Sequence, residues 1–192
     1  MTINRLSLLA LTLCLGLSGC SSVLTATRDG PINDDQGTRT LGSKIDDSVI
    51  ETKVAVNVAK ADPDLDAASH IVVSSYNGIV LLAGQTPRED LKAKAEQAAS
   101  SVQRVKKVNN ELQILQPSSL AARSNDTWLT SKIKAQMLTD NTIPGSRIKV
   151  ITENGIVYLM GLVTQQEATR ATNLVQGVGG VQKIVKLFEY ID

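Results

Sequence analysis

The residues that most often carry enzyme chemistry are few in this 192-residue chain and form no recognisable pattern. Its single histidine, His70, lies at the entrance to an expected strand, where a surface or edge position is favoured over a role as general base. The serines lack the G-x-S-x-G turn of a nucleophilic serine, and Gly179-Gly180 lacks the spacing and the lysine of a phosphate-binding loop. We therefore expect a protein that is not an enzyme, with no catalytic residue and no small-molecule substrate.

Carboxylates alternate with other residues around Pro63, at Asp62, Asp64 and Asp66, and this alternation could suggest calcium. The stretch lacks the later glycine and the terminal glutamate of a calcium-binding loop. A solvated turn at the end of a helix is the favoured interpretation, and we expect neither a metal nor a non-covalent cofactor.

The N-terminus has the composition of an export signal. Arg5 supplies a positive charge, the run from Leu6 to Leu17 is apolar but too short to cross a bilayer, and Ser18-Gly19 places small residues before Cys20. We predict that residues 1–19 are a signal peptide and that the chain is exported.

Leu17-Ser18-Gly19-Cys20 resembles the lipobox of bacterial lipoproteins. The resemblance implies cleavage before Cys20 and a covalent lipid anchor of N-acyl and S-diacylglycerol groups, including palmitate, on that residue; a chance cysteine after an ordinary signal peptide is the alternative. Ser21, rather than aspartate, follows the cysteine, which implies sorting to the outer membrane. Cys14 leaves with the signal peptide, so no thiol remains for a disulfide, a metal or a nucleophile.

Residues 20–43 show no periodic hydrophobicity and are rich in Ser, Thr, Gly, Asp and Asn. This composition predicts a flexible tether without recognition content, carrying the lipid at its first residue.

Asn-Gly occurs twice between apolar runs, as Asn77-Gly78 and as Asn154-Gly155. A type I′ turn needs positive φ at both central residues, which makes Asn-Gly a strong hairpin signal. A glycine follows each second run, Gly84 and Gly161, and we expect it to end the strand where the chain turns into a helix. Two hairpins of one design indicate two copies of one domain.

Around each hairpin the sequence predicts the order helix, strand, strand, helix, strand. In each copy acidic or amide residues are expected to cap the first helix, at Asp46-Asp47 and at Asn125-Asp126. The expected elements of the first copy are a helix from Asp46 to about Asp62 with Ile50, Val54 and Val58 inward, strands 71–74 and 79–82, a helix 88–101 and a strand 107–114. Those of the second are a helix with Leu129 and Ile133 inward, strands 148–151 and 156–160, a helix 167–176 and a strand 182–190.

The repeat sets the predicted domain boundaries. The first domain covers residues 44–116, a linker containing Pro117 covers 117–123, and the second domain covers 124–192.

A late V-x-G-V element follows the second helix of each copy, as Val102-Gln103-Arg104-Val105 and Val178-Gly179-Gly180-Val181. With the element order and the Asn-Gly hairpin, it resembles the BON domain; Arg104 departs from the usual glycine. The resemblance implies an α+β fold of two tandem BON domains, each α-β-β-α-β with a three-stranded sheet covered on one face by two helices. Two such domains behind a lipobox resemble a family of outer-membrane lipoproteins with two BON domains.

Trp128 is the informative residue of the second copy. At 100° per residue, Leu129 and Ile133 define the inward face of its first helix, and Trp128 lies roughly 120° from the centre of that face. Leu138 also falls away from the core. The matching positions of the first copy are Val49 and Ala59, so the second copy has gained apolar bulk on its outer face.

Charge points to the same copy, because residues 117–192 carry eight basic and six acidic residues, net +2, against net −1 for residues 43–116. An exposed Trp128 with Lys132, Lys134 and Leu138 has the composition of a membrane-interface anchor. The open alternative is that Trp128 packs on the other copy or on a loop.

The family resemblance implies that this helix binds anionic phospholipid, with Trp128, Lys132, Lys134 and Leu138 as its site residues. It further implies a role in envelope integrity at the periplasmic face of the outer membrane, at places of lipid turnover or curvature such as the division septum. The rival interpretation is a periplasmic scaffold that binds outer-membrane assembly proteins. Export and near-neutral charge argue against nucleic acid as a partner.

Overall fold

The computed structural model describes residues 37–191, which belong to one compact unit. The predicted signal peptide, the predicted lipid site Cys20, and the predicted tether up to residue 36 lie outside the described residues.

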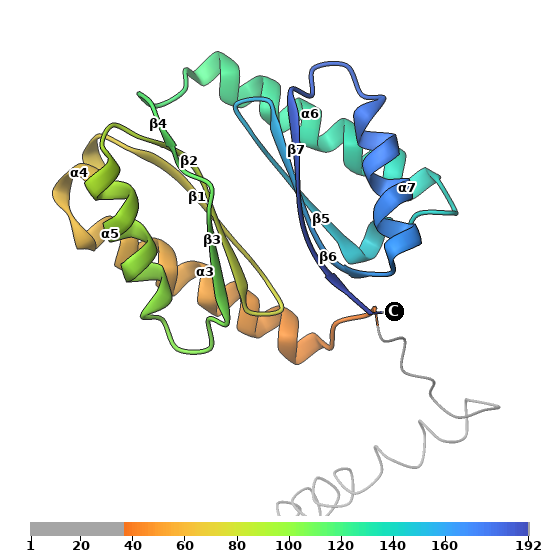
Figure 1. Ribbon diagram of the computed structural model, residues 1–192, viewed down its shortest axis with the longest axis horizontal. Helices are drawn as coiled ribbons and strands as arrows, with labels where there is room; N and C mark the ends of the chain where they lie inside the picture. The colour runs from red at the N-terminus through yellow and green to blue at the C-terminus, as the bar shows by residue number, and fades with distance from the viewer. Residues whose placement is uncertain (1–36, 192) are drawn as a thin grey trace, which may run out of the picture. The chain divides into compact units, whose positions relative to one another are not determined.

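The first domain is built on strand β2 (Ile79–Thr86), which pairs antiparallel with β1 (His70–Tyr76) and parallel with β3 (Lys107–Asn110) and β4 (Gln113–Ile114). Figure 1 shows helices α3 (Leu41–Ala61) and α5 (Glu89–Ser100) on one face of this sheet. A short helix, α4 (Pro63–Ala67), joins α3 to β1. The predicted last strand is therefore present as two segments, β3 and β4.

The second domain repeats this plan. Strand β6 (Ile156–Val163) pairs antiparallel with β5 (Ile148–Glu153) and parallel with β7 (Lys183–Tyr190). Helices α6 (Leu120–Thr139) and α7 (Gln165–Gln176) cover one face (Figure 1). A 3₁₀ turn, η1 (Gly145–Arg147), precedes β5. The predicted α+β fold of two tandem domains is confirmed.

Both first helices begin earlier than the sequence pattern indicated. Helix α3 begins at Leu41, where the Thr40 hydroxyl accepts the N–H of Ser43 at 3.1 Å. Helix α6 begins at Leu120, where Ser119 caps it in the same way. The prediction that Asp46-Asp47 and Asn125-Asp126 cap these helices is wrong, because a hydroxyl residue six or seven positions earlier already satisfies the first turn.

The two Asn-Gly turns have the predicted backbone. Asn77 and Gly78 have φ of 53° and 80°, and Asn154 and Gly155 have φ of 50° and 73°. Positive φ at both central positions is what a type I′ hairpin turn requires. In the strand register Tyr76 pairs with Ile79 and Glu153 pairs with Ile156, so only the two turn residues separate the paired strands of each hairpin.

Gly84 and Gly161 lie inside strands β2 and β6 rather than at their ends, so the prediction that they end these strands is wrong. A Cβ on Gly84, which has φ of 119°, would lie 2.0 Å from the carbonyl oxygen of His70. A Cβ on Gly161 would lie 2.9 Å from the carbonyl oxygen of Arg147. The glycines are needed because the paired strand passes too close for a side chain.

The central strands are apolar throughout because both of their faces are buried. Val80 and Leu82 of β2 face the helices of the first domain, and Leu81 and Ala83 face the other way. Those outward-facing residues join a third core with the corresponding face of β6, so the two sheets pack against each other. Its buried members are Tyr76, Leu81, Ala83, Ile156, Tyr158 and Met160.

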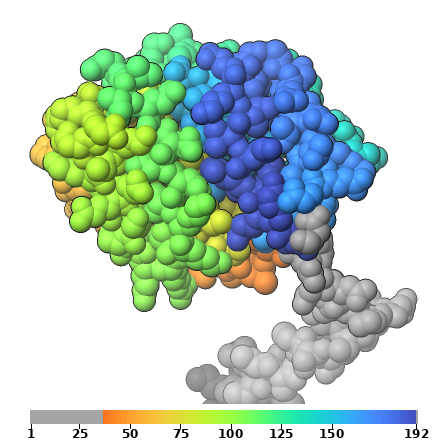
Figure 2. Space-filling view, viewed as in Figure 1, coloured from red at the N-terminus to blue at the C-terminus, as the bar shows by residue number. Residues whose placement is uncertain are grey.

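Polar contacts border this third core. The Tyr76 hydroxyl donates to the carbonyl oxygen of Arg147 at 2.6 Å, and Asn77 Nδ2 donates to Glu189 Oε1 at 3.0 Å. Lys149 of the second domain forms an ion pair with Glu51 of the first. In Figure 2 the first-domain chain, in green, and the C-terminal segment, in dark blue, meet along a continuous seam.

His70 belongs to the same interface. Its Nε2 lies 3.5 Å from Oε2 of Glu153, a carboxylate of the second domain that also accepts from Gln85 Nε2 at 3.0 Å. The sequence favoured a surface or edge position for His70. The structure instead places its side chain beside a carboxylate of the second domain.

Candidate functional site

The outer face of α6 carries the predicted site. Leu129, Ile133 and Met137 are buried against the second sheet. On the other side of the helix Trp128 is 57% exposed and Leu138 is 65% exposed. The prediction that Trp128 faces away from its own core is confirmed, and its exposure excludes packing on the other domain.

Two of the predicted site residues are in direct contact. Lys132 Nζ lies 4.9 Å from the centroid of the Trp128 ring, which is within the range of a cation–π interaction. Lys132 follows Trp128 by four residues and so shares its side of the helix. The result is an apolar ring with a positive charge held over it, next to solvent.

Lys134 lies on a different side of α6. It lines a polar pocket of about 320 Å³ between the two domains, together with Lys44 and Lys149. Six residues separate Lys134 from Trp128, which places the two side chains about 120° apart around the helix. The structure therefore groups Trp128 with Lys132 and places Lys134 at the flank, beside the first domain.

An exposed apolar stripe on α3 was missed from the sequence. Leu41, Ile45, Val49 and Val56 are 74%, 57%, 45% and 47% exposed. The conclusion that only the second copy gained apolar bulk rested on comparing Trp128 with Val49 and Leu138 with Ala59. Leu41 and Ile45 were left out of that comparison because the first helix was expected to begin at Asp46. Their spacing of four, four and seven residues is the signal that could have revealed the stripe once Thr40 was taken as the cap.

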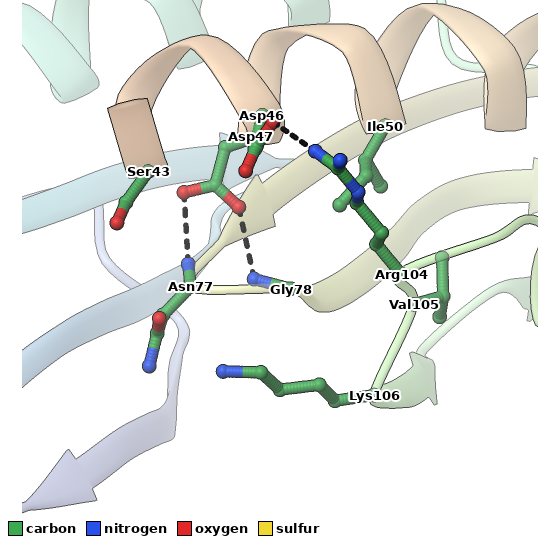
Figure 3. A pocket seen from close by; sticks show the side chains of 9 residues that line it. All are labelled: Ser43, Asp46, Asp47, Ile50, Asn77, Gly78, Arg104, Val105 and Lys106. Carbon is green, nitrogen blue, oxygen red and sulfur yellow. Dashed lines mark hydrogen bonds and ion pairs between the residues drawn. The ribbon is translucent and has the colours of Figure 1, made fainter. Parts of the chain in front are cut away.

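A second region of interest is the pocket between α3 and the first Asn-Gly turn, with a volume of about 460 Å³ (Figure 3). The buried carboxylate of Asp47 points into the turn and accepts the backbone N–H groups of Asn77 and Gly78, each at 2.9 Å. The Ser75 hydroxyl donates to the same carboxylate at 2.7 Å, and Arg39 forms an ion pair with it. All of these donors favour the ionised form.

Burial raises the pKa of Asp47, but the hydrogen bonds from Gly78, Ser75, Asn77 and Arg39 outweigh it and hold the pKa below its ordinary value. Asp126 makes the same contact in the second domain, where it accepts the N–H groups of Asn154 at 2.8 Å and Gly155 at 2.9 Å. We call this contact between a helical aspartate and the Asn-Gly turn the brace. An aspartate engaged in this way holds a turn in place and is not available as a proton acceptor.

Arg104 reaches across the same pocket and forms an ion pair with Asp46 (Figure 3). It adopts φ of 73°, the left-handed conformation that Gly180 adopts at the corresponding place in the second domain with φ of 102°. With Asp46, Asp47 and Arg104 paired to protein groups, the pocket is a structural notch beside the turn.

The carboxylates around Pro63 also have protein partners. Asp62 accepts the backbone N–H of Asp64 and pairs with Lys94 at 2.6 Å, and Asp64 pairs with Arg88 at 2.6 Å. Across residues 37–191 no group of three or more His, Cys, Asp or Glu side chains is arranged to hold a metal ion. Within the same range no helix has the length and hydropathy to cross a membrane.

The comparisons with known proteins agree with the repeat. The BON domain profile matches residues 46–116 and 125–192. The chain is 37% identical over 194 residues, 100% of both chains, to the outer membrane lipoprotein DolP of Haemophilus influenzae. It is 35% identical to a 21 kDa hemolysin of Actinobacillus pleuropneumoniae, over 80% of this chain and 78% of that one. To the osmotically-inducible protein Y of Escherichia coli it is 31% identical, over 78% of this chain and 75% of that one. The predicted resemblance to outer-membrane lipoproteins with two BON domains is confirmed.

Proposed function

This chain belongs to the BON-domain family, and on that premise we propose that it is an outer-membrane lipoprotein whose second BON domain binds anionic phospholipid. The proposed anchor is lipid on Cys20, and the proposed binding surface is the outer face of α6. The full-length similarity to a protein named as an outer membrane lipoprotein supports the location. The proposed role of the present chain is to support envelope integrity at the periplasmic face of the outer membrane, including the division septum.

The observation that carries the proposal is the exposure of Trp128 and Leu138 on one helix, with Lys132 over the indole ring. An indole prefers the headgroup region of a bilayer, where its ring is in an apolar environment and its N–H can still find a polar partner. Leu138 supplies an aliphatic side chain for the acyl region. Lys132 supplies the charge that meets a lipid phosphate.

The charges decide which lipid is favoured. A basic residue near an anionic membrane surface contributes about 1 kcal/mol of binding free energy, so Lys132 and Lys134 together contribute about 2 kcal/mol. A zwitterionic surface has no net potential to supply this contribution. The proposal therefore predicts selectivity for phosphatidylglycerol or cardiolipin over phosphatidylcholine.

The lipid anchor and the helix act together. A lipid chain on Cys20 keeps the protein on the membrane, and a tether raises the effective concentration of a weak second contact. The helix surface can therefore be weak in isolation and still decide where on the membrane the protein resides. Incorporation of labelled palmitate into the full chain, and its loss in Cys20→Ser, tests the anchor separately.

The direct test uses the soluble unit Gln36–Asp192, because both domain cores and the interface between them lie within it. We expect Trp128→Glu to weaken binding to phosphatidylglycerol vesicles by about fivefold or more, since it removes the indole and adds a charge of the wrong sign worth about 1 kcal/mol. The chain contains one tryptophan, so its fluorescence shift on vesicle addition reports the same contact in the unchanged protein.

Gln97→Glu is the matched control, because Gln97 is an exposed residue of α5, a helix of the first domain. It adds the same charge and should leave vesicle binding within about twofold, because the charge is placed on a different helix from Trp128 and Lys132. Equal binding by Trp128→Glu and the unchanged protein overturns the proposal. If the Trp128 variant instead loses a purified outer-membrane assembly protein, the surface belongs to a scaffold.

A further inference from the structure

Helix α3 of the first domain has an apolar face that no part of the described chain covers. Its buried side chains, Asp47, Ile50, Val54 and Val58, face the first sheet. The exposed stripe of Leu41, Ile45, Val49 and Val56 is centred about 180° from that buried face. These four side chains therefore point directly away from the domain.

The acidic residues of α3 are all engaged by cations from elsewhere in the protein. Asp46 pairs with Arg104, Asp47 with Arg39, and Glu51 with Lys149. The lysines of the helix, in contrast, have no side-chain hydrogen bond or ion pair among residues 37–191. These lysines, Lys44, Lys53 and Lys60, lie at both edges of the apolar stripe.

The arrangement is that of a helix lying at a membrane surface, with an apolar face between cationic edges. Lys44, Ile45, Val49 and Lys53 also border a shallow, mainly apolar hollow of about 520 Å³ on this face. A second copy of the chain is a poorer occupant, because self-association through the stripe would bring lysines against lysines.

The position of α3 in the chain adds a second argument. Leu41 lies 21 residues after Cys20, the proposed lipid anchor. Twenty-one residues span at most about 75 Å even when fully extended, so the start of α3 stays within that distance of the membrane that holds the proposed lipid. No other element of the described fold is as near to the anchor along the chain.

We propose that the outer face of α3 is a second membrane-contacting surface, which places Leu41, Ile45 and Val49 among the lipids of an anionic leaflet. This inference rests on the proposed function only in that both surfaces bind the same anionic lipid. Lys44 of α3 and Lys134 of α6 line one pocket between the domains, so the two helices border a shared cationic region. Arg39 and Lys149 in that pocket are already paired, which leaves Lys44 and Lys134 to meet a lipid phosphate.

The test compares Ile45→Glu with Asn57→Glu in the soluble unit Gln36–Asp192. Both residues are exposed on α3, and Asn57 lies about 115° from the centre of the stripe. With vesicles of phosphatidylglycerol and phosphatidylcholine, we expect Ile45→Glu to weaken binding by about fivefold and Asn57→Glu by less than about twofold. Equal binding by both variants overturns the inference, provided that thermal unfolding shows each to be folded.

A second measurement does not depend on an acidic substitution. Both cysteines of the sequence precede Gln36, so Val49→Cys gives the soluble unit a single thiol for an environment-sensitive fluorophore. Contact with lipid should shift the emission to the blue on phosphatidylglycerol vesicles, whereas the same label in Asn57→Cys should not respond. An unshifted label at position 49 overturns the inference even if the Ile45 variant binds weakly.

The two surfaces can be separated by the same assay. If Trp128→Glu loses binding and Ile45→Glu does not, the inference fails and the proposed function of α6 stands. If Ile45→Glu loses binding and Trp128→Glu does not, α3 is the lipid-binding helix and the proposed role of α6 fails. If Ile45→Glu changes the sedimentation coefficient of the lipid-free protein, the stripe binds a second copy and the membrane inference is overturned.

Discussion

Oδ1 of Asp47 accepts the backbone N–H of Gly78 at 2.9 Å, and Oδ1 of Asp126 accepts that of Gly155 at the same distance. In each domain one buried helical aspartate therefore binds the hairpin turn that starts the central strand. The contact fixes the first helix to the sheet at one point. Because the lipid-facing surfaces proposed above lie on the opposite side of the same two helices, this brace also sets how those surfaces are presented.

Replacing either aspartate should destabilise the protein. In Asp47→Ala the N–H groups of Asn77 and Gly78 lose a charged, buried acceptor, and a donor left unsatisfied in that way costs about 1–3 kcal/mol. We expect Asp47→Ala and Asp126→Ala each to lower the free energy of unfolding by about 3 kcal/mol in urea denaturation.

Asp46→Ala serves as the comparison for that pair of variants. Asp46 is next to Asp47 in the chain, but its carboxylate is half exposed and pairs with an exposed arginine. Such a surface pair is worth about 0–1 kcal/mol, so this variant should stay within that range of the unchanged protein. A loss for Asp47→Ala no larger than that of Asp46→Ala would show that the brace contributes little.

Acid should weaken the first domain through the same group. The pKa of Asp47 in the folded protein lies below its unfolded value, so its contribution to stability is present above the unfolded pKa of about 3.9 and is lost as the pH falls through the folded pKa. The stability difference between the unchanged protein and Asp47→Asn should therefore be constant near neutral pH and shrink on acidification below about pH 4. A difference that stays the same in urea melts down to about pH 2.5 contradicts this assignment.

The hairpins could be predicted from the sequence because one local rule determines them: few residues other than Asn and Gly tolerate two successive positive φ angles. The helix starts could not be placed as well, because Asp47 and Asp126 have the residue type of a cap while their backbone partners are 28 to 31 residues away in the chain, at the turn. A contact over that distance leaves no local pattern. Thr40 and Ser119, which cap the helices, lie in stretches that otherwise have the composition of tether and linker.

The site was predictable to the extent that it depends on helical geometry. Trp128 followed from a repeat of 3.6 residues per turn and from comparison with Val49. The interface between the sheets did not follow, although Val80 to Ala83 is apolar at every position and such a run indicates a strand buried on both faces. A run of that kind does not say what covers the second face, and here it is the other copy of the same strand.

The strand glycines should differ in how they respond to alanine. Gly84 combines φ of 119° with a carbonyl oxygen 2.0 Å from the added Cβ, and backbone atoms cannot move aside as a flexible side chain can. We expect Gly84→Ala to cost about 4 kcal/mol or to prevent folding, in the range of the most damaging single substitutions. Gly161→Ala meets the backbone at 2.9 Å and has no positive φ, so we expect about 2 kcal/mol. Equal Tm values for the two variants would contradict this order.

Arg104 should tolerate glycine better than alanine. Its φ of 73° is the left-handed conformation, which costs a residue with a Cβ about 1–2 kcal/mol and costs glycine nothing. Arg104→Ala and Arg104→Gly both lose the exposed ion pair with Asp46, and only glycine relieves the backbone. We therefore expect Arg104→Gly to be more stable than Arg104→Ala by about 1 kcal/mol in urea denaturation. The reverse substitution in the second domain, Gly180→Ala, should cost a similar amount, since its added Cβ would meet only Leu129 at ordinary contact distance. Equal stabilities within the Arg104 pair would mean that the loop relaxes to negative φ.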